Sequence, residues 1–209
     1  MICFGSRDAI QQNISKVAWH HAKRYKKGLG TLIIYNPFII QITWKERKAM
    51  NVTIKEKTSF QVMGIKRSYS YQNDENLKGI PMFWKEANQN GEADSLASLN
   101  NGELTGLLGV CVDTPKQDKM DYWIGVSTKA GANEEYEQLE VPAGKWAIFA
   151  VTGPMPRSMQ KVWKQIYAEW LPASMYTISG NISLERYQDG DPSSKDYYSE
   201  IWIPIREKK

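Results

Sequence analysis

The sequence predicts an α+β fold in which a module of strand, helix, strand and strand occurs twice. Segments with strand and helix periodicity follow one another in the same order in both halves. The closing strands also match, because Tyr122-Trp123-Ile124-Gly125-Val126 aligns with Ile201-Trp202-Ile203-Pro204-Ile205 with the tryptophans in register. We therefore expect two antiparallel sheets, each covered by one helix and related by a pseudo-twofold axis.

The first copy begins with a predicted strand over residues 59–66. A predicted helix over residues 79–90 follows and ends at Gly91, a residue type that commonly stops helices. Its apolar side chains recur at helical spacing: Ile80, Phe83, Trp84 and Ala87. Two further strands are predicted over residues 106–112 and 122–127.

The second copy has predicted strands over residues 145–151, 181–187 and 199–205 and a helix over residues 157–171. Pro156 lies near the start of this helix, and Pro172 lies beyond its end. Its apolar face contains Met159, Val162, Trp163, Ile166, Tyr167 and Trp170. A sheet covered by one helix keeps an open face, so we expect the halves to pair and to leave a central ligand groove along their seam.

The composition is that of a globular protein, with 42% hydrophobic and 24% charged residues among 209. The first residues lack the apolar core of a signal peptide, and the longest apolar run, residues 32–44, is interrupted by Asn36-Pro37 and Gln41. Only Cys3 and Cys111 are present, which suits a reducing compartment. We expect a cytoplasmic protein without a membrane span.

Charge is distributed unevenly, which predicts a boundary near residue 51. Residues 1–50 contain nine Lys or Arg against two Asp or Glu, whereas residues 51–209 contain 18 against 21. A basic cluster within a predicted helix over residues 9–29 has the chemistry to meet phosphate, although a solvated helix face explains it equally well. We expect a basic extension over residues 1–51 and a second domain over residues 52–209.

Most catalytic classes lack their residues in this chain. The two histidines, His20 and His21, are adjacent, so they diverge on any regular element and do not readily share a metal ion. No Ser-His-Asp or Cys-His arrangement and no glycine-rich phosphate loop is present. We expect no metal, no cofactor and no catalytic residues of these classes. A binding function is therefore favoured over a catalytic one.

Four ordered motifs carry a family resemblance: Val141-Pro142-Ala143-Gly144-Lys145-Trp146-Ala147-Ile148-Phe149, Ile166-Tyr167-Ala168-Glu169-Trp170-Leu171-Pro172, Leu184-Glu185-Arg186-Tyr187 and Glu200-Ile201-Trp202-Ile203-Pro204-Ile205. Residues 52–207 resemble the gyrase-inhibitor-like (GyrI-like) small-molecule-binding domain, also called the effector-binding domain of AraC-type and multidrug-responsive transcription regulators. The resemblance implies a duplicated helix-on-sheet module with a central pocket for aromatic, often cationic, small molecules.

The N-terminal part carries a second resemblance. Residues 22–48 look like the tail of an AraC-type DNA-binding domain and its joint to an effector domain. An AraC-type DNA-binding domain has two recognition helices, and a predicted helix of about 20 residues does not supply both. The extension therefore resembles a remnant, and DNA is expected as a partner only where a complete DNA-binding domain is present.

Glu185 is the residue on which the predicted site depends. The strand pleat places Glu185 on one face with Tyr187, and the family resemblance assigns that glutamate to the ligand. A carboxylate buried among aromatic rings needs a cation or hydrogen-bond donors, which a cationic ligand supplies. The alternative is a surface ion pair between Glu185 and a Lys or Arg.

Six further aromatic residues are candidate ligand contacts. Strand parity places Trp202 and Tyr198 on one face, and the register of the repeat makes Trp123 their counterpart. Trp84, Tyr167 and Trp170 lie on amphipathic helix faces, where core packing is the alternative. Aromatic faces hold flat cations by stacking and cation–π attraction, so broad ligand specificity is expected.

The leading hypothesis is an effector-binding protein, either the sensing domain of a transcription regulator or a protein that sequesters its ligand. The first alternative is a hydrolase of reactive cyclopropane-type compounds, which some family members resemble, with Glu185 as acid or base assisted by Tyr187 or Tyr198. The second alternative is a protein-interaction module of the gyrase-inhibitor type.

Overall fold

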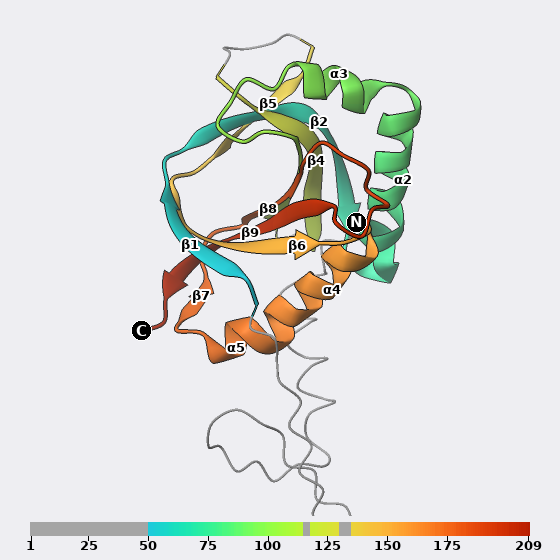
Figure 1. The fold of residues 1–209 in the computed structure, drawn as a ribbon. Coiled ribbons are helices and arrows are strands. Elements are labelled where there is room, and N and C mark those ends of the chain that lie inside the picture. Colours follow the sequence, from blue (N-terminus) through green and yellow to red (C-terminus); the bar gives the residue numbers. More distant parts are fainter. Residues whose placement is uncertain (1–49, 115–117, 130–134) are drawn as a thin grey trace, which may run out of the picture.

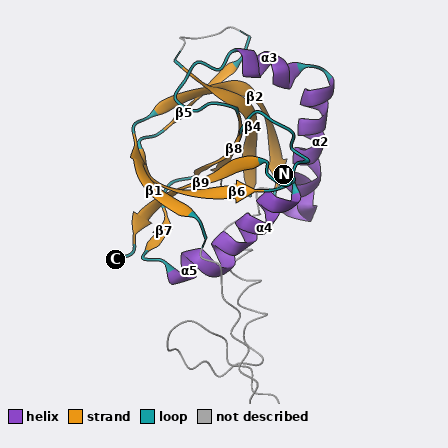
Figure 2. Ribbon diagram, viewed as in Figure 1, coloured by secondary structure: helices purple, strands orange, loops and turns teal. Residues whose placement is uncertain are grey.

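A computed structural model describes residues 50–114, 118–129 and 135–209. Within these ranges nine antiparallel strands form one sheet that curls into an incomplete ring, with the helices on its outside (Figures 1 and 2). The strands are β1 (Val52–Lys57), β2 (Phe60–Ser70), β3 (Leu107–Thr114), β4 (Lys119–Thr128), β5 (Glu137–Val141), β6 (Gly144–Thr152), β7 (Tyr176–Ile178), β8 (Ile182–Tyr187) and β9 (Tyr198–Glu207).

The predicted duplication is visible in the order of the elements. The first half contains β2, α2, β3 and β4, and the second half contains β6, α4, β8 and β9. The strand order across the sheet is β1-β6-β9-β8-β3-β4-β2-β5, while β7 pairs with β9. The α+β class is thus confirmed, but the two expected sheets are one sheet, because β3 and β8 pair at the centre.

The edge strands are exchanged between the halves. β1 precedes β2 in the chain but pairs with β6, and β5 precedes β6 but pairs with β2. Each half is therefore completed by a strand that is continuous with the other half. This exchange ties the halves together at both ends of the sheet as well as at its centre.

The first helix is α2 (Glu75–Gln89), which buries the predicted apolar face through Ile80, Phe83, Trp84 and Ala87. It starts four residues before the predicted start. Gly91 ends it in the left-handed conformation, with φ of 82°. The chain then enters a second helix, α3 (Glu92–Ser98), which the sequence did not predict.

The second predicted helix is divided into three parts. α4 (Arg157–Gln165) continues into a π-helical turn, η3 (Ile166–Trp170), and then into α5 (Leu171–Ala173). Met159, Trp163 and Ile166 are buried. A π-turn changes the angle between successive side chains. Tyr167 and Trp170 nevertheless pack, half-buried, against the same core cluster as Trp163, so the predicted apolar face is kept beyond Ile166.

The curled sheet has an apolar core on each face. The outer core lies under the helices and includes Phe149, Trp163 and Ile201. The inner core lies inside the curl: Phe60, Val62, Leu104, Leu108, Val110, Trp123, Val141, Trp146, Ile148, Ile182, Leu184 and Trp202. Because successive side chains on a strand point to opposite faces, β8 directs Leu184 inward and Glu185 outward.

The basic cluster, the helix predicted over residues 9–29 and the AraC-like segment lie outside the described residues, so the predicted boundary near residue 51 stays a prediction. In the part of the chain that the structure describes, every helix is too short or too polar to cross a membrane.

Candidate functional site

Glu185 lies in the middle of the sheet and is fully buried, with an exposed fraction of 0%. It is paired across the central strands with Gly109. The Trp163 indole N–H donates to Oε1 at 2.7 Å, and the Tyr187 hydroxyl donates to Oε2 at 2.8 Å. The Tyr122 hydroxyl lies 3.3 Å from Oε2 and is a third donor. The carboxylate is therefore surrounded by neutral hydrogen-bond donors.

Both halves and both principal helices converge on this carboxylate. Trp163 reaches it directly from α4. Trp84 of α2 reaches it through Tyr122, because its indole N–H donates to the Tyr122 hydroxyl at 2.8 Å. The Trp84 ring also packs edge-on against Tyr187, with ring centroids 5.3 Å apart. Hydrogen bonds thus connect Glu185 directly to α4 and, through Tyr122, to α2.

The two tyrosines are neutral donors at physiological pH. Burial raises the pKa of Tyr122 and of Tyr187 well above 10.0, and the nearby negative charge of Glu185 raises both further. Among the described residues, no Lys or Arg forms an ion pair with Glu185. The alternative of a surface ion pair does not hold, and the negative charge is met by hydrogen bonds alone.

Gly109 makes room for this arrangement. A Cβ atom at Gly109 would lie 2.2 Å from the Tyr122 hydroxyl oxygen and 3.3 Å from Glu185 Oε2. The first distance is far below van der Waals contact. The missing side chain leaves room for the phenol of Tyr122 to pass over Gly109 and reach the carboxylate.

The structure brings together three of the predicted site residues: Glu185, Tyr187 and Trp84. Tyr167 is next to this group, since its ring stacks on Trp163 with centroids 5.9 Å apart. Trp170 lies farther along the helix, edge-on to Phe149 at 4.9 Å. The role of these residues as ligand contacts stays a prediction.

Three predicted residues lie on the other face of the sheet, in contrast to the expectation of one shared groove. Trp123 and Trp202 belong to the inner core. Tyr198 donates to Glu200 at 2.9 Å. Strand parity is the physical reason, since β9 directs Tyr198 and Trp202 inward and Ile201 outward to the side of Glu185.

Tyr122, Trp163 and Gly109 are site residues that sequence reasoning missed. The sequence places Trp163 on the apolar face of the second predicted helix and Tyr122 in a predicted strand, and assigns neither to the site. A usable signal exists, because buried indole and phenol groups need a polar partner. The sequence does not say which partner, since Tyr122 and Trp163 are 63 and 22 positions from Glu185.

A second carboxylate, Glu200, lies on the inner face, where side chains of the protein itself supply its hydrogen bonds and its ion pair. It accepts hydrogen bonds from Trp202 Nε1 at 2.8 Å and Tyr198 at 2.9 Å, and Arg186 pairs with it at 3.0 Å. Burial works against its charged form, but these three donors outweigh burial and lower the pKa of Glu200 below 4.5. This cluster is a structural ion pair.

The lowered pKa of Glu200 makes stability depend on pH. Because the folded pKa lies below the unfolded one, the contribution is present above pH 4.5 and is lost as the pH falls through the folded pKa. We expect the free energy of unfolding from urea titrations to decrease below this pH. In Glu200→Gln the decrease should be smaller, and an unchanged slope would contradict this assignment.

Residues 50–206 match the GyrI-like small molecule binding domain. SAV2435 in complex with tetraphenylphosphonium is similar in structure, with a TM-score of 0.69 and 28% identity, over 75% of this chain and 94% of that chain. A Staphylococcus aureus MU50 protein assigned to bacterial transcription regulation has a TM-score of 0.64 and 29% identity, over 76% and 99%.

A Vibrio cholerae integron cassette protein shares the fold at a TM-score of 0.53 and 19% identity, over 74% of this chain and 95% of that chain. No curated protein sequence matches the chain. The family match covers almost all of the described residues, including the central strand pair and both principal helices. The chain therefore belongs to the family of GyrI-like small molecule binding domains.

Proposed function

We propose that the small molecule bound by this domain is an aromatic or lipophilic organic cation and that its charge is met by Glu185. The observation that carries the proposal is a fully buried carboxylate contacted by three neutral donors and, among the described residues, by no basic side chain. A buried negative charge without a counter-charge gains most from a cation.

The surroundings of the carboxylate suit such a ligand. The rings of Trp84, Trp163 and Tyr187 lie around it and turn their N–H or O–H edges to the carboxylate or to Tyr122, and the π-faces of aromatic rings attract cations. Each stacked ring contributes about 0.5–2 kcal/mol without close shape matching. SAV2435, which is 28% identical over 94% of its length, binds the lipophilic cation tetraphenylphosphonium and so supports the same ligand class here.

The site is fully occupied by protein donors, which sets a requirement for binding. Both carboxylate oxygens are engaged, one by Trp163 and one by the two tyrosines. A cation in contact with Glu185 replaces at least one of these neutral donors. The exchange is favourable when the charge–charge attraction in this low-dielectric site exceeds the hydrogen bond that is lost.

Isothermal titration calorimetry tests the ligand class directly. We expect saturable binding of tetraphenylphosphonium. To test the charge, methyltriphenylphosphonium is compared with triphenylphosphine oxide, which has the same three phenyl groups but no net charge and should bind at least about tenfold more weakly. The difference reports the charge, because both compounds present the same aromatic surface. Absence of binding, or equal affinity for both compounds, would overturn the proposal.

The biological setting we propose is ligand sensing for a transcription regulator, or sequestration by the domain alone. The hydrolase alternative has one geometric basis, which is the 2.8 Å contact between the Tyr187 hydroxyl and Glu185. Tyr198 does not serve it, because this residue bonds Glu200 on the inner face. Mass spectrometry of an electrophilic ligand after incubation separates the alternatives, since sensing leaves the ligand intact.

A further inference from the structure

Trp84 occupies the oxygen of one of the groups that hold Glu185. Its indole N–H donates to the Tyr122 hydroxyl oxygen at 2.8 Å, and the Tyr122 hydroxyl lies 3.3 Å from Glu185 Oε2. An indole has a donor but no acceptor, so the direction of the first hydrogen bond is fixed. The Tyr122 hydrogen is therefore directed to the carboxylate, and Trp84 acts on Glu185 through Tyr122.

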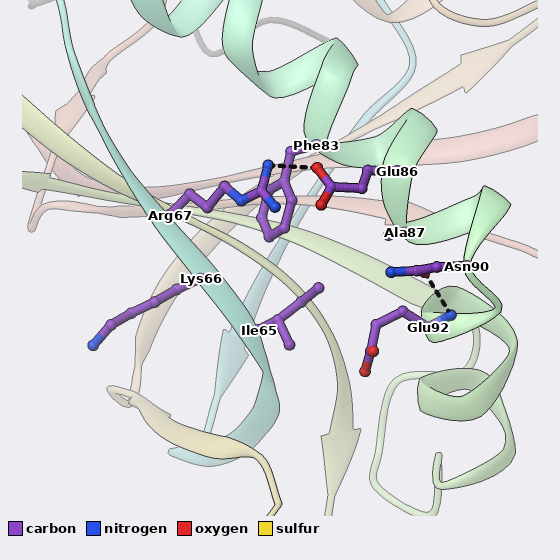
Figure 3. A pocket seen from close by; sticks show the side chains of 8 residues that line it. All are labelled: Ile65, Lys66, Arg67, Phe83, Glu86, Ala87, Asn90 and Glu92. Atoms are coloured by element: carbon purple, nitrogen blue, oxygen red, sulfur yellow. Dashed lines mark hydrogen bonds and ion pairs between the residues drawn. The ribbon is translucent and has the colours of Figure 1, made fainter.

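Contacts that do not involve the Trp84 N–H attach α2 to the sheet. Figure 3 shows Arg67 of β2 next to Phe83 and Glu86 of α2. The Arg67 guanidinium lies 4.3 Å from the Phe83 ring centroid and pairs with Glu86 at 2.8 Å. Phe83 itself is buried in the outer core. Removal of the Trp84 N–H alone therefore changes a hydrogen bond and leaves the other contacts of the helix in place.

Hydrogen-bond donors take up most of the acceptor positions at this site. The donors are the indoles of Trp84 and Trp163 and the hydroxyls of Tyr122 and Tyr187. A carboxylate has about four acceptor positions, and each phenol oxygen has about one. The strand carbonyls of β8 are engaged in the sheet, because β8 pairs with β3 and with β9. About two acceptor positions thus remain on these side chains, one on Glu185 and one on Tyr187.

This balance of donors and acceptors distinguishes two kinds of organic cation. A primary ammonium group adds about three N–H donors, which exceeds the acceptor positions that remain. At least one donor of the ligand or of the protein is then buried without an acceptor, which is unfavourable. A quaternary cation carries its charge without N–H groups, so a protein donor that it displaces from Glu185 still has an acceptor to turn to.

We infer that Trp84 is a positioning residue that makes the site selective for cations without N–H groups over primary ammonium compounds. It does so by engaging the Tyr122 oxygen and by keeping the Tyr122 hydroxyl a donor to Glu185. The inference rests on the proposed function, because it concerns the cation that meets Glu185. It narrows that ligand to cations whose charged centre is fully alkylated or arylated.

Isothermal titration calorimetry with two biphenyl compounds tests this selectivity in the wild type. The compounds are (biphenyl-4-ylmethyl)trimethylammonium and biphenyl-4-ylmethylammonium, which share their aromatic group and are both cationic at neutral pH. We expect the primary ammonium compound to bind at least about tenfold more weakly than the quaternary one. Equal or tighter binding of the primary ammonium compound would overturn the inference.

Trp84→Phe separates the hydrogen bonds from the burial of the ligand's methyl groups. The methyl groups of the quaternary compound favour its binding to the wild type and to the variant alike. The variant keeps an aromatic ring, removes one donor and returns the Tyr122 oxygen as an acceptor, so the ratio of the two affinities should fall at least about fivefold. An unchanged ratio in a variant that is folded by circular dichroism would contradict the role of Trp84.

Tyr122→Phe is the matched control, because it breaks the same chain of hydrogen bonds. It removes a donor and an acceptor together, so the excess of donors stays and the affinity ratio should remain within about twofold of the wild type. An equal fall of the ratio in both variants would assign the effect to a loosened site and overturn the inference. Binding of neither compound to the wild type would contradict the proposed function as well, whereas binding without selectivity would overturn this inference alone.

Discussion

Replacement of Glu185 by glutamine should weaken tetraphenylphosphonium binding by about 10- to 100-fold, as measured by isothermal titration calorimetry. The substitution keeps the size and shape of the side chain and removes its charge. This fold-change corresponds to a loss of about 1.4–2.7 kcal/mol of charge–charge attraction between the cation and the carboxylate. Affinity for the neutral triphenylphosphine oxide should change little, because aromatic packing around the site is kept.

The control for this variant is the other carboxylate of the central strands. Glu200 lies on β9, and its side chain is 12% exposed, but it faces the inner side of the curl and is paired with Arg186. Glu200→Gln should keep tetraphenylphosphonium affinity within about twofold, provided that the variant is folded by circular dichroism. Equal affinity of Glu185→Gln and the wild type would place the cation elsewhere. Loss in Glu200→Gln alone would place it on the inner face.

Addition of one methyl group at Gly109 should damage both stability and binding. The new Cβ would meet the Tyr122 hydroxyl at 2.2 Å, so the phenol must move away from Glu185 or the central strands must separate. Overpacking of this kind costs about 1–3 kcal/mol, which urea denaturation measures. Because Trp84 donates to the same hydroxyl, the displacement also weakens the connection between α2 and the site.

A double variant shows whether the clash has the predicted cause. In Gly109→Ala with Tyr122→Phe the nearest oxygen is absent. The double variant should therefore lose at least about 0.5 kcal/mol less unfolding free energy than the sum of the losses in the two single variants. Gly144→Ala is the matched control, because a Cβ there meets no atom within 4 Å and its unfolding free energy should barely change. Strict additivity in the double variant would show that another contact carries the cost of Gly109→Ala.

The helices and strands that could be predicted are those whose apolar residues recur at regular helical or strand spacing. Ile80, Phe83, Trp84 and Ala87 mark the buried face of α2, and the predicted strands of both copies are all present. The strands that were missed are β1, β5 and β7. β1 and β5 are mostly exposed edges, and β7 has three residues, so none shows the alternation that marks a half-buried strand.

The candidate site was predicted only in part. The pleat of β8 correctly places Tyr187 beside Glu185, since this relation extends over two residues. The donors Tyr122 and Trp163 come from β4 and α4, and no local pattern links them to the carboxylate. Trp123 and Trp202 follow the predicted parity, but the face of the sheet on which they lie is the inside of the curl, where it forms an apolar core.

Backbone geometry alone dictates which side chains share a strand face or a helix face, so the duplicated element order and the position of Glu185 beside Tyr187 can be read from residue spacing. The union of two halves in one curled sheet, the exchange of edge strands and the gathering of three donors around one carboxylate depend on contacts between distant segments. Such contacts form through packing and burial, which spacing along the chain does not encode.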